Sequence, residues 1–120
     1  MMSSCLTKLE LKELGDSKIQ AFDKRIASIP GDLCAPFHQE ARQLEIELLT
    51  IYSFVVLGVR KELDLSIVAS AWGAMVEMCD AVGKSLVKLH QQHPYCGAGA
   101  YYDSVLDLRN KCHRLQKMHQ

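Results

Sequence analysis

Residues 44–59 read LEIELLTIYSFVVLGV, and the second half of this stretch carries no charge. Several of its residues favour strands as well as helices, so both structures must be weighed. The stretch continues without Gly, Pro or a turn signal from EARQLEIEL, a segment of strong helix formers. Apolar residues recur at alternating spacings of four and three, a period that a strand would not keep; they are Phe37, Ala41, Leu44, Leu48, Ile51 and Val55. The stretch therefore predicts a helix with a buried face.

The opposite face of this helix changes character along its length. A polar stripe of Glu40, Gln43, Glu47 and Thr50 continues at helical spacing as Phe54 and Leu57 before it returns to Lys61. A helix that becomes apolar all round is usually covered on every side. Phe54 and Leu57 are therefore our interface candidates: either another segment of this chain covers them, or they contact a partner.

The remaining sequence predicts three more helical segments. The first covers residues 4–29, opens at Ser4, is broken at Gly15 and Asp16, and stops at Pro30, Gly31 and Asp32. Asp32 or Ala35 opens the second helix, and a tight turn around residues 62–66, where Asp64 or Ser66 can act as a cap, separates it from the third. The fourth begins near Gly99 and runs to the C terminus.

The third and fourth segments repeat the same apolar pattern. In the third, the apolar positions are Val68, Trp72, Met75, Cys79, Val82, Leu86 and Leu89. Its predicted solvent-exposed face consists of Ser70, Gly73, Glu77, Asp80, Lys84 and Lys88. In the fourth, they are Tyr101, Val105, Leu108, Cys112 and Leu115. Short connections between such helices favour antiparallel neighbours. The fold class is therefore all-α: one domain of residues 1–120, an up-and-down antiparallel four-helix bundle with a broken first helix.

Composition narrows the classes of function. With 14 basic and 14 acidic residues the formal net charge is zero, so no overall field attracts nucleic acid or an anionic membrane. The five cysteines are odd in number and irregularly spaced, which indicates free thiols in a reducing compartment. The start lacks a secretory signal, and the uncharged run before Val59 is shorter than the roughly 20 residues that span a bilayer. We therefore expect a cytoplasmic protein that is not inserted in a membrane.

His90, His93 and Cys96 form the most metal-like spacing in the chain. Imidazole and thiolate at such spacing can bind zinc, but a closed structural site needs four ligands. Cys112 would lie about 20 Å away along the fourth helix. The alternative interpretation is that the two histidines form a solvated helix end and that Cys112 is a small core residue.

The acids Glu77 and Asp80, in the segment EMCD, are similar to the second acidic motif of MazG-type nucleotide pyrophosphatases. That resemblance implies a magnesium-dependent nucleotide hydrolase in which a glutamate of the second helix, such as Glu47, completes the site. The second helix departs from the family's pattern, because Glu40, Glu45 and Glu47 do not form its doubled-Glu motif. The alternative is that these acids are simply solvated.

The segment RLQKMH, from Arg114 to His119, is similar to the Arg, four residues, His motif of HEPN-fold ribonucleases. The resemblance implies a ribonuclease that uses these two side chains. The polar residue usual after the arginine is Leu115 here, and His119 is next to the last residue.

No group of reactive residues in the sequence stands out as a catalytic site. The leading hypothesis is therefore a non-catalytic helical-bundle protein that functions by binding another protein. It would act as a homodimer or as an accessory subunit of a larger assembly, with Phe54 and Leu57 at the interface. We expect a protein partner, which is another copy or a different chain, rather than a membrane or a nucleic acid. We expect no cofactor and no resident metal.

Overall fold

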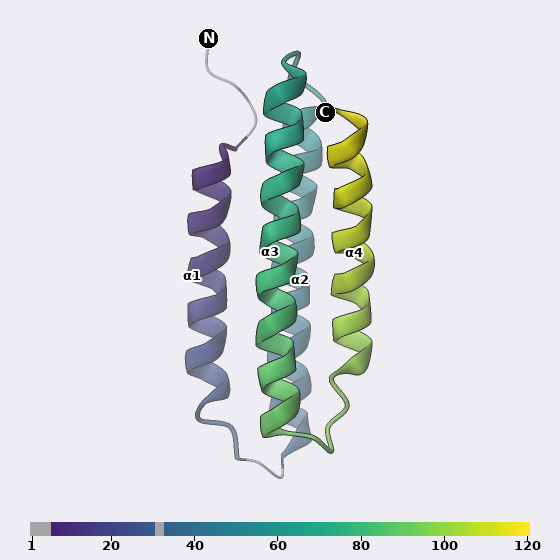
Figure 1. Ribbon diagram of the computed structural model, residues 1–120. Coiled ribbons are helices and arrows are strands. Elements are labelled where there is room, and N and C mark those ends of the chain that lie inside the picture. Colours follow the sequence, from purple (N-terminus) through teal and green to yellow (C-terminus); the bar gives the residue numbers. More distant parts are fainter. Residues whose placement is uncertain (1–5, 31–32) are drawn as a thin grey trace.

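The computed structural model describes residues 6–30 and 33–120 of the chain. Four helices follow one another: α1 (Lys8–Ile26), α2 (Cys34–Val59), α3 (Leu65–Gln92) and α4 (Gly99–Met118). They run alternately up and down as an elongated bundle with extents of 51 × 23 × 16 Å (Figure 1). The predicted all-α, up-and-down four-helix bundle is confirmed.

Helix α3 lies at the centre of this arrangement. It packs against α1, α2 and α4, whereas α1 and α4 do not pack against each other. In Figure 1, α1 and α4 flank α3 on opposite sides and α2 lies behind it. No other described helix covers the outer surface of α3 between α1 and α4, and we call this surface the open side of the bundle. The outer surface of α2 lies on a separate side.

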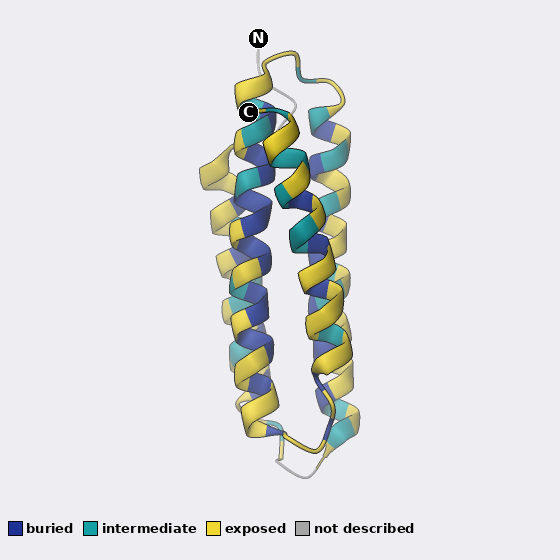
Figure 2. Ribbon diagram, turned by 45° about the vertical axis from the view of Figure 1, so that its right-hand side comes forward, coloured by how far each residue is buried: buried dark blue, intermediate teal, exposed yellow. Residues whose placement is uncertain are grey.

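The predicted apolar positions of α2 and α3 form the core. Phe37, Leu44, Met75 and Leu89 are among the fully enclosed side chains, and all the other predicted stripe residues of these two helices are also buried. In α4, Val105, Leu108 and Cys112 are buried, whereas Tyr101 and Leu115 are half-buried. Figure 2 shows the buried segments facing inward and the exposed segments facing solvent. The three-and-four spacing thus identified the inner faces correctly.

The predicted break in the first helix is wrong, because α1 continues through Gly15 and Asp16. Gly15 is buried against α3, and a Cβ at this position would lie 3.0 Å from Cγ of Met78. The glycine therefore provides close packing between two helices. Asp16 caps nothing and instead accepts a 3.0 Å hydrogen bond from Nζ of Lys12, one turn earlier.

Capping residues explain the helix boundaries. The side chain of Thr7 accepts from the backbone N–H of Glu10, and the Glu10 carboxylate accepts from the backbone N–H of Thr7, which makes a capping box that opens α1. The predicted cap Ser4 and the predicted stop residues Gly31 and Asp32 lie outside the described residues. The turn between α2 and α3 covers residues 60–64, slightly earlier than predicted, and Asp64 caps α3 by accepting from the N–H of Ser66.

A disulfide joins Cys34, at the start of α2, to Cys96, in the loop between α3 and α4. The prediction of free thiols is therefore wrong for these two cysteines. Sequence spacing did not indicate the pair because 62 positions separate its members, and only the antiparallel return of the chain brings them together. Disulfides are typical of oxidising compartments, so the cysteines no longer argue for a reducing one.

By length and composition, α3 is the one helix among the described residues that could cross a membrane. Half of its apolar window is buried inside the bundle. The core helix of a four-helix bundle has the same composition, because it contacts neighbours on several sides.

Candidate functional site

The outer side of α2 carries four exposed apolar side chains, which we call the α2 outer face: Ile46, Leu49, Phe54 and Leu57. They are 48%, 43%, 61% and 54% exposed, respectively. Of the two alternatives for Phe54 and Leu57, cover by another described segment of the chain is therefore excluded. The sequence pattern did not single out Ile46 and Leu49, although their spacing to Ser53 and Leu57 places them on the same side of the helix.

Two hydroxyl residues, Thr50 and Ser53, lie between these apolar side chains. The Thr50 hydroxyl donates to the Ile46 carbonyl oxygen at 2.8 Å, and the Ser53 hydroxyl donates to the Leu49 carbonyl oxygen at 3.0 Å. Each donor is thus satisfied inside the helix. Because an unsatisfied buried donor costs about 1–3 kcal/mol, this arrangement lets the face be covered without that penalty.

Polar and aromatic contacts border the α2 outer face. On one flank, Nε2 of Gln43 donates to Oε1 of Glu47 at 3.3 Å. On the other, the Tyr52 ring packs with the Trp72 ring at a centroid distance of 5.8 Å, and Nζ of Lys111 lies 5.3 Å from the centroid of Tyr52. These two sets of contacts therefore lie along the two long edges of the α2 outer face.

The carboxylates considered for magnesium are held in separate places. The Glu77 carboxylate pairs with Lys8 of α1 at 3.5 Å, and the Asp80 carboxylate pairs with Arg109 of α4 at 3.2 Å. Glu47 lies on α2, where its Oε2 atom is buried and has no hydrogen-bond partner among the described residues. Within residues 6–30 and 33–120, no three His, Cys, Asp or Glu side chains gather in a way that could hold a metal ion.

The three residues with metal-like spacing at the end of α3 have other surroundings than a metal site. Cys96 is in the disulfide with Cys34, and His90 is exposed. His93 is only 2% exposed, and its ring packs against Phe37 of α2 at a centroid distance of 5.7 Å. The interpretation of His93 as a solvated residue is therefore wrong, because the start of α2 covers this end of α3.

Near the same end of the bundle, Nδ1 of His38 lies 2.9 Å from the Tyr101 hydroxyl, which joins α2 to α4. Together with the disulfide, this contact holds the loop between α3 and α4 against the start of α2. The disulfide and the contact between His38 and Tyr101 therefore have a structural role at this end of the bundle.

Arg114 and His119 lie at the other end of α4. Arg114 is within the helix, while His119 is the residue that follows its last turn. Because His119 lies beyond the helix, helical geometry does not fix its side chain relative to Arg114. The catalytic pair therefore stays a prediction.

Within residues 6–30 and 33–120, two cysteines have free thiols, Cys79 of α3 and Cys112 of α4, and both are buried in the core; Cys5 lies outside the described residues. A hydrogen bond with Cys112 and burial away from water together raise the pKa of Cys79 far above the ordinary thiol value. Since the thiolate is the reactive form, the raised pKa and the burial of Cys79 both disfavour its reaction as a nucleophile. The prediction that Cys112 is a small core residue is confirmed.

Comparisons with protein-family models, with curated proteins and with solved structures give no match to this chain.

Proposed function

We propose that this chain is a non-catalytic interaction protein that pairs with a second copy of itself through the α2 outer face. The observation that carries the proposal is the combination of four exposed apolar side chains with hydroxyl donors that are already satisfied inside the helix. Exposed apolar patches of this kind mark sites of protein contact. The face is located where no other described helix packs.

The face suits a symmetric, antiparallel pairing of two α2 helices. A two-fold axis at the level of residues 51 and 52 places Ile46 opposite Leu57 and Thr50 opposite Ser53. The centre of the contact is then formed by small side chains, which let the helices approach, while larger apolar side chains fill the layers on either side. A two-fold dimer uses the same patch on both copies, so one such face is sufficient.

The net charge of the chain does not oppose the pairing of whole molecules. The chain carries equal numbers of basic and acidic residues, so two copies have no net repulsion at neutral pH. The face itself contains no charged residue between Glu47 and Arg60. Its burial therefore removes apolar surface from water without removing an ion.

Sedimentation equilibrium tests the proposal. We expect the wild-type chain to be a dimer whose dissociation is measurable on dilution, and the Phe54→Glu and Leu57→Glu variants to be monomers with unchanged helical circular dichroism. Each substitution would place two carboxylates in the apolar contact. Leu9→Glu is the matched control, because Leu9 of α1 is 64% exposed but lies on a different helix. The control should sediment as the wild type does.

A wild-type chain that stays monomeric at the highest attainable concentration would contradict self-association. Dissociation of the Leu9→Glu control to the same degree as Phe54→Glu would show that the contact lies elsewhere.

A further inference from the structure

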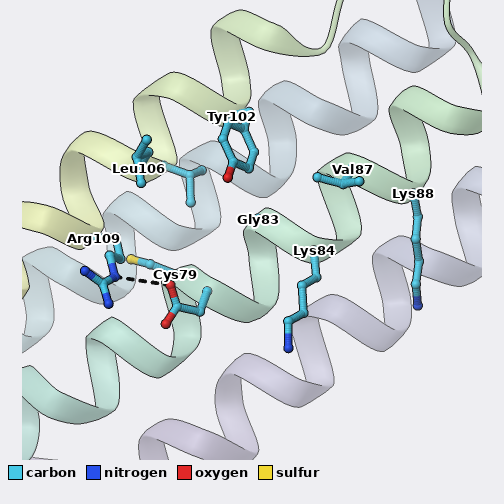
Figure 3. A pocket seen from close by; sticks show the side chains of 10 residues that line it. Cys79, Gly83, Lys84, Val87, Lys88, Tyr102, Leu106 and Arg109 are labelled. Carbon is cyan, nitrogen blue, oxygen red and sulfur yellow. Dashed lines mark hydrogen bonds and ion pairs between the residues drawn. The ribbon is translucent and has the colours of Figure 1, made fainter.

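A groove with a volume of about 550 Å³ runs between α3 and α4 on the open side of the bundle, away from the α2 outer face. Figure 3 shows Gly83, Val87 and Lys88 of α3 along the groove and Tyr102 and Leu106 of α4 above it. Val87, Tyr102 and Leu106 are 44%, 39% and 41% exposed, so three large apolar side chains from two helices meet here without cover. Gly83 adds no side chain to the floor, where a Cβ would lie in ordinary van der Waals contact with the Tyr102 ring at 3.6 Å.

Cations predominate on the rim of the groove. Lys84, Lys88 and Arg109 line it, whereas Asp80 is the single acid among its lining residues. Asp80 accepts from Nε of Arg109 at 3.2 Å and so neutralises part of that charge. The remaining excess of positive charge occurs on a chain whose net charge is zero. It therefore favours an anion at this place.

The two ends of the groove differ, since a guanidinium lies at one end and two large apolar side chains, with Lys88 beside them, lie at the other. Arg109 lies near one end, close to Leu106 (Figure 3), and pairs with Asp80. At the other end, Val87 and Tyr102 also line an adjoining hollow of about 230 Å³ that extends to Ala98 and Gly99. From Cys79 to Lys88 the floor follows α3 for on the order of 14 Å. An anionic group at the Arg109 end would leave room for an extended apolar chain toward Gly99.

The guanidinium of Arg109 has donors to offer such a group. It carries five N–H groups. Nε donates to Asp80, and Nη1 donates to Asn110 at 3.5 Å. The remaining N–H groups match the two oxygens of a carboxylate. Lys84 lies one turn along α3 from Asp80 and also lines the groove, but its side chain extends away from Arg109 (Figure 3). It therefore adds positive charge to the rim and makes no shared contact with Arg109.

We propose that the groove between α3 and α4 binds a single-chain amphipathic carboxylate, with its carboxylate at Arg109 and its apolar chain along Gly83, Val87 and Tyr102. The site is separate from the α2 outer face, so it does not depend on whether the chain dimerises. Pockets of 300–1,000 Å³ with mostly apolar walls and a few polar groups are typical of small-molecule sites.

Titration calorimetry with dodecanoate below its micelle concentration tests this site, and amide chemical shifts locate the contact. We expect saturable binding, with shifts centred on Gly83 and Tyr102. Dodecanol, which lacks the charge, and dodecyltrimethylammonium, which reverses it, should each bind at least tenfold more weakly. Acetate, which lacks the chain, should not bind measurably.

Three variants connect the binding to the groove. Arg109→Gln should weaken dodecanoate binding about tenfold, because it removes the charged contact with the carboxylate. Lys84→Gln should weaken binding less than Arg109→Gln does, because it lowers only the positive charge of the rim. Gly83→Leu should abolish binding by filling the floor, while leaving the helical circular dichroism intact, since leucine favours helices more than glycine does. Lys24→Gln, on the far helix α1, is the matched control and should bind as the wild type does.

Any of three results would overturn the proposal. The first is no saturable binding of dodecanoate to the wild-type chain. The second is equal affinity for dodecyltrimethylammonium, which would show that only apolar surface is recognised. The third is a set of shifts centred on Phe54 and Leu57, which would place the ligand on the α2 outer face.

Discussion

Trp72 shows how a single buried group can be left unpaired in the core. The residue is 3% exposed, and its ring packs with Tyr52, but its indole N–H has no hydrogen-bond partner among the described residues. Leaving a buried donor unsatisfied costs about 1–3 kcal/mol. Trp72 therefore stabilises the bundle through the apolar contacts of its ring, and its unpaired indole N–H offsets part of that stabilisation.

We expect Trp72→Phe to change the free energy of unfolding by less than about 1 kcal/mol, because removal of the unpaired donor offsets the loss of ring contacts. Trp72→Ala should cost about 3–5 kcal/mol, since it leaves a cavity. Urea denaturation followed by circular dichroism measures both. Equal losses in the two variants would indicate that the indole N–H does have a partner.

At the scale of whole helices, the sequence pattern predicted which faces are buried but not how the ends are fixed. The stripe through Leu48 and the stripe through Val82 are both buried, because helical spacing alone determines which side chains share a face. The Cys34–Cys96 disulfide and the burial of His93 depend on which helix ends meet, and no local pattern encodes that meeting. Gly15 was misread for the same reason: its role is contact with Met78 of another helix.

Substitutions on these helices separate the buried from the exposed faces. Leu48→Asp and Val82→Asp should unfold the protein, because Leu48 and Val82 are each 3% exposed and the new charge would have no partner. Glu77→Ala and Lys84→Ala should change the stability by no more than about 0.5 kcal/mol. Thermal melts of the four variants measure this difference. Similar melting temperatures in all four would contradict the assignment of faces.

The disulfide stabilises the junction of α2 with the loop between α3 and α4. It closes a loop of 62 positions, for which the chain-entropy model gives about 4 kcal/mol of stabilisation. We expect the Cys34→Ser/Cys96→Ser double variant to unfold at lower urea concentration than the oxidised wild type. Reductant should lower the wild-type midpoint toward that of the double variant and leave the variant itself unchanged. A reductant effect of equal size in the variant would exclude this bond as the cause.

At the scale of the molecule, the sequence predicted four antiparallel helices but left open how they surround one another. The pattern did not place α3 in contact with all three neighbours or separate α1 from α4. That arrangement leaves two uncovered apolar regions, one on α2 and one between α3 and α4. Part of the first was anticipated through Phe54 and Leu57. The region between α3 and α4 was missed. Lys84 and Lys88 predicted only a solvent-exposed face of the third helix, whereas Tyr102 and Leu106 reach the same groove from α4.

Electrostatic engineering tests the proposed antiparallel arrangement of the dimer. Arg42 lies in α2, and Arg60 is the residue that follows its last turn and keeps helical backbone angles. The two are 18 positions apart, which is five helical turns, so they lie along the same line of the bundle surface. In the two-fold pairing, Arg42 of each copy comes to the level of Arg60 of the other. The wild-type dimer should therefore tighten as salt rises, because salt screens this like-charge contact.

Arg60→Glu replaces both like-charge contacts by opposite-charge pairs, so we expect it to tighten the dimer roughly tenfold at low salt. The same variant should weaken as salt rises, which reverses the wild-type trend. Lys61→Glu makes the same change of charge at the next residue, in the turn after α2, and is the matched control, with a smaller effect expected. Sedimentation at several salt concentrations measures both. If Arg60→Glu left the affinity unchanged while Phe54→Glu still dissociated the dimer, the two α2 helices would have to pair in another orientation.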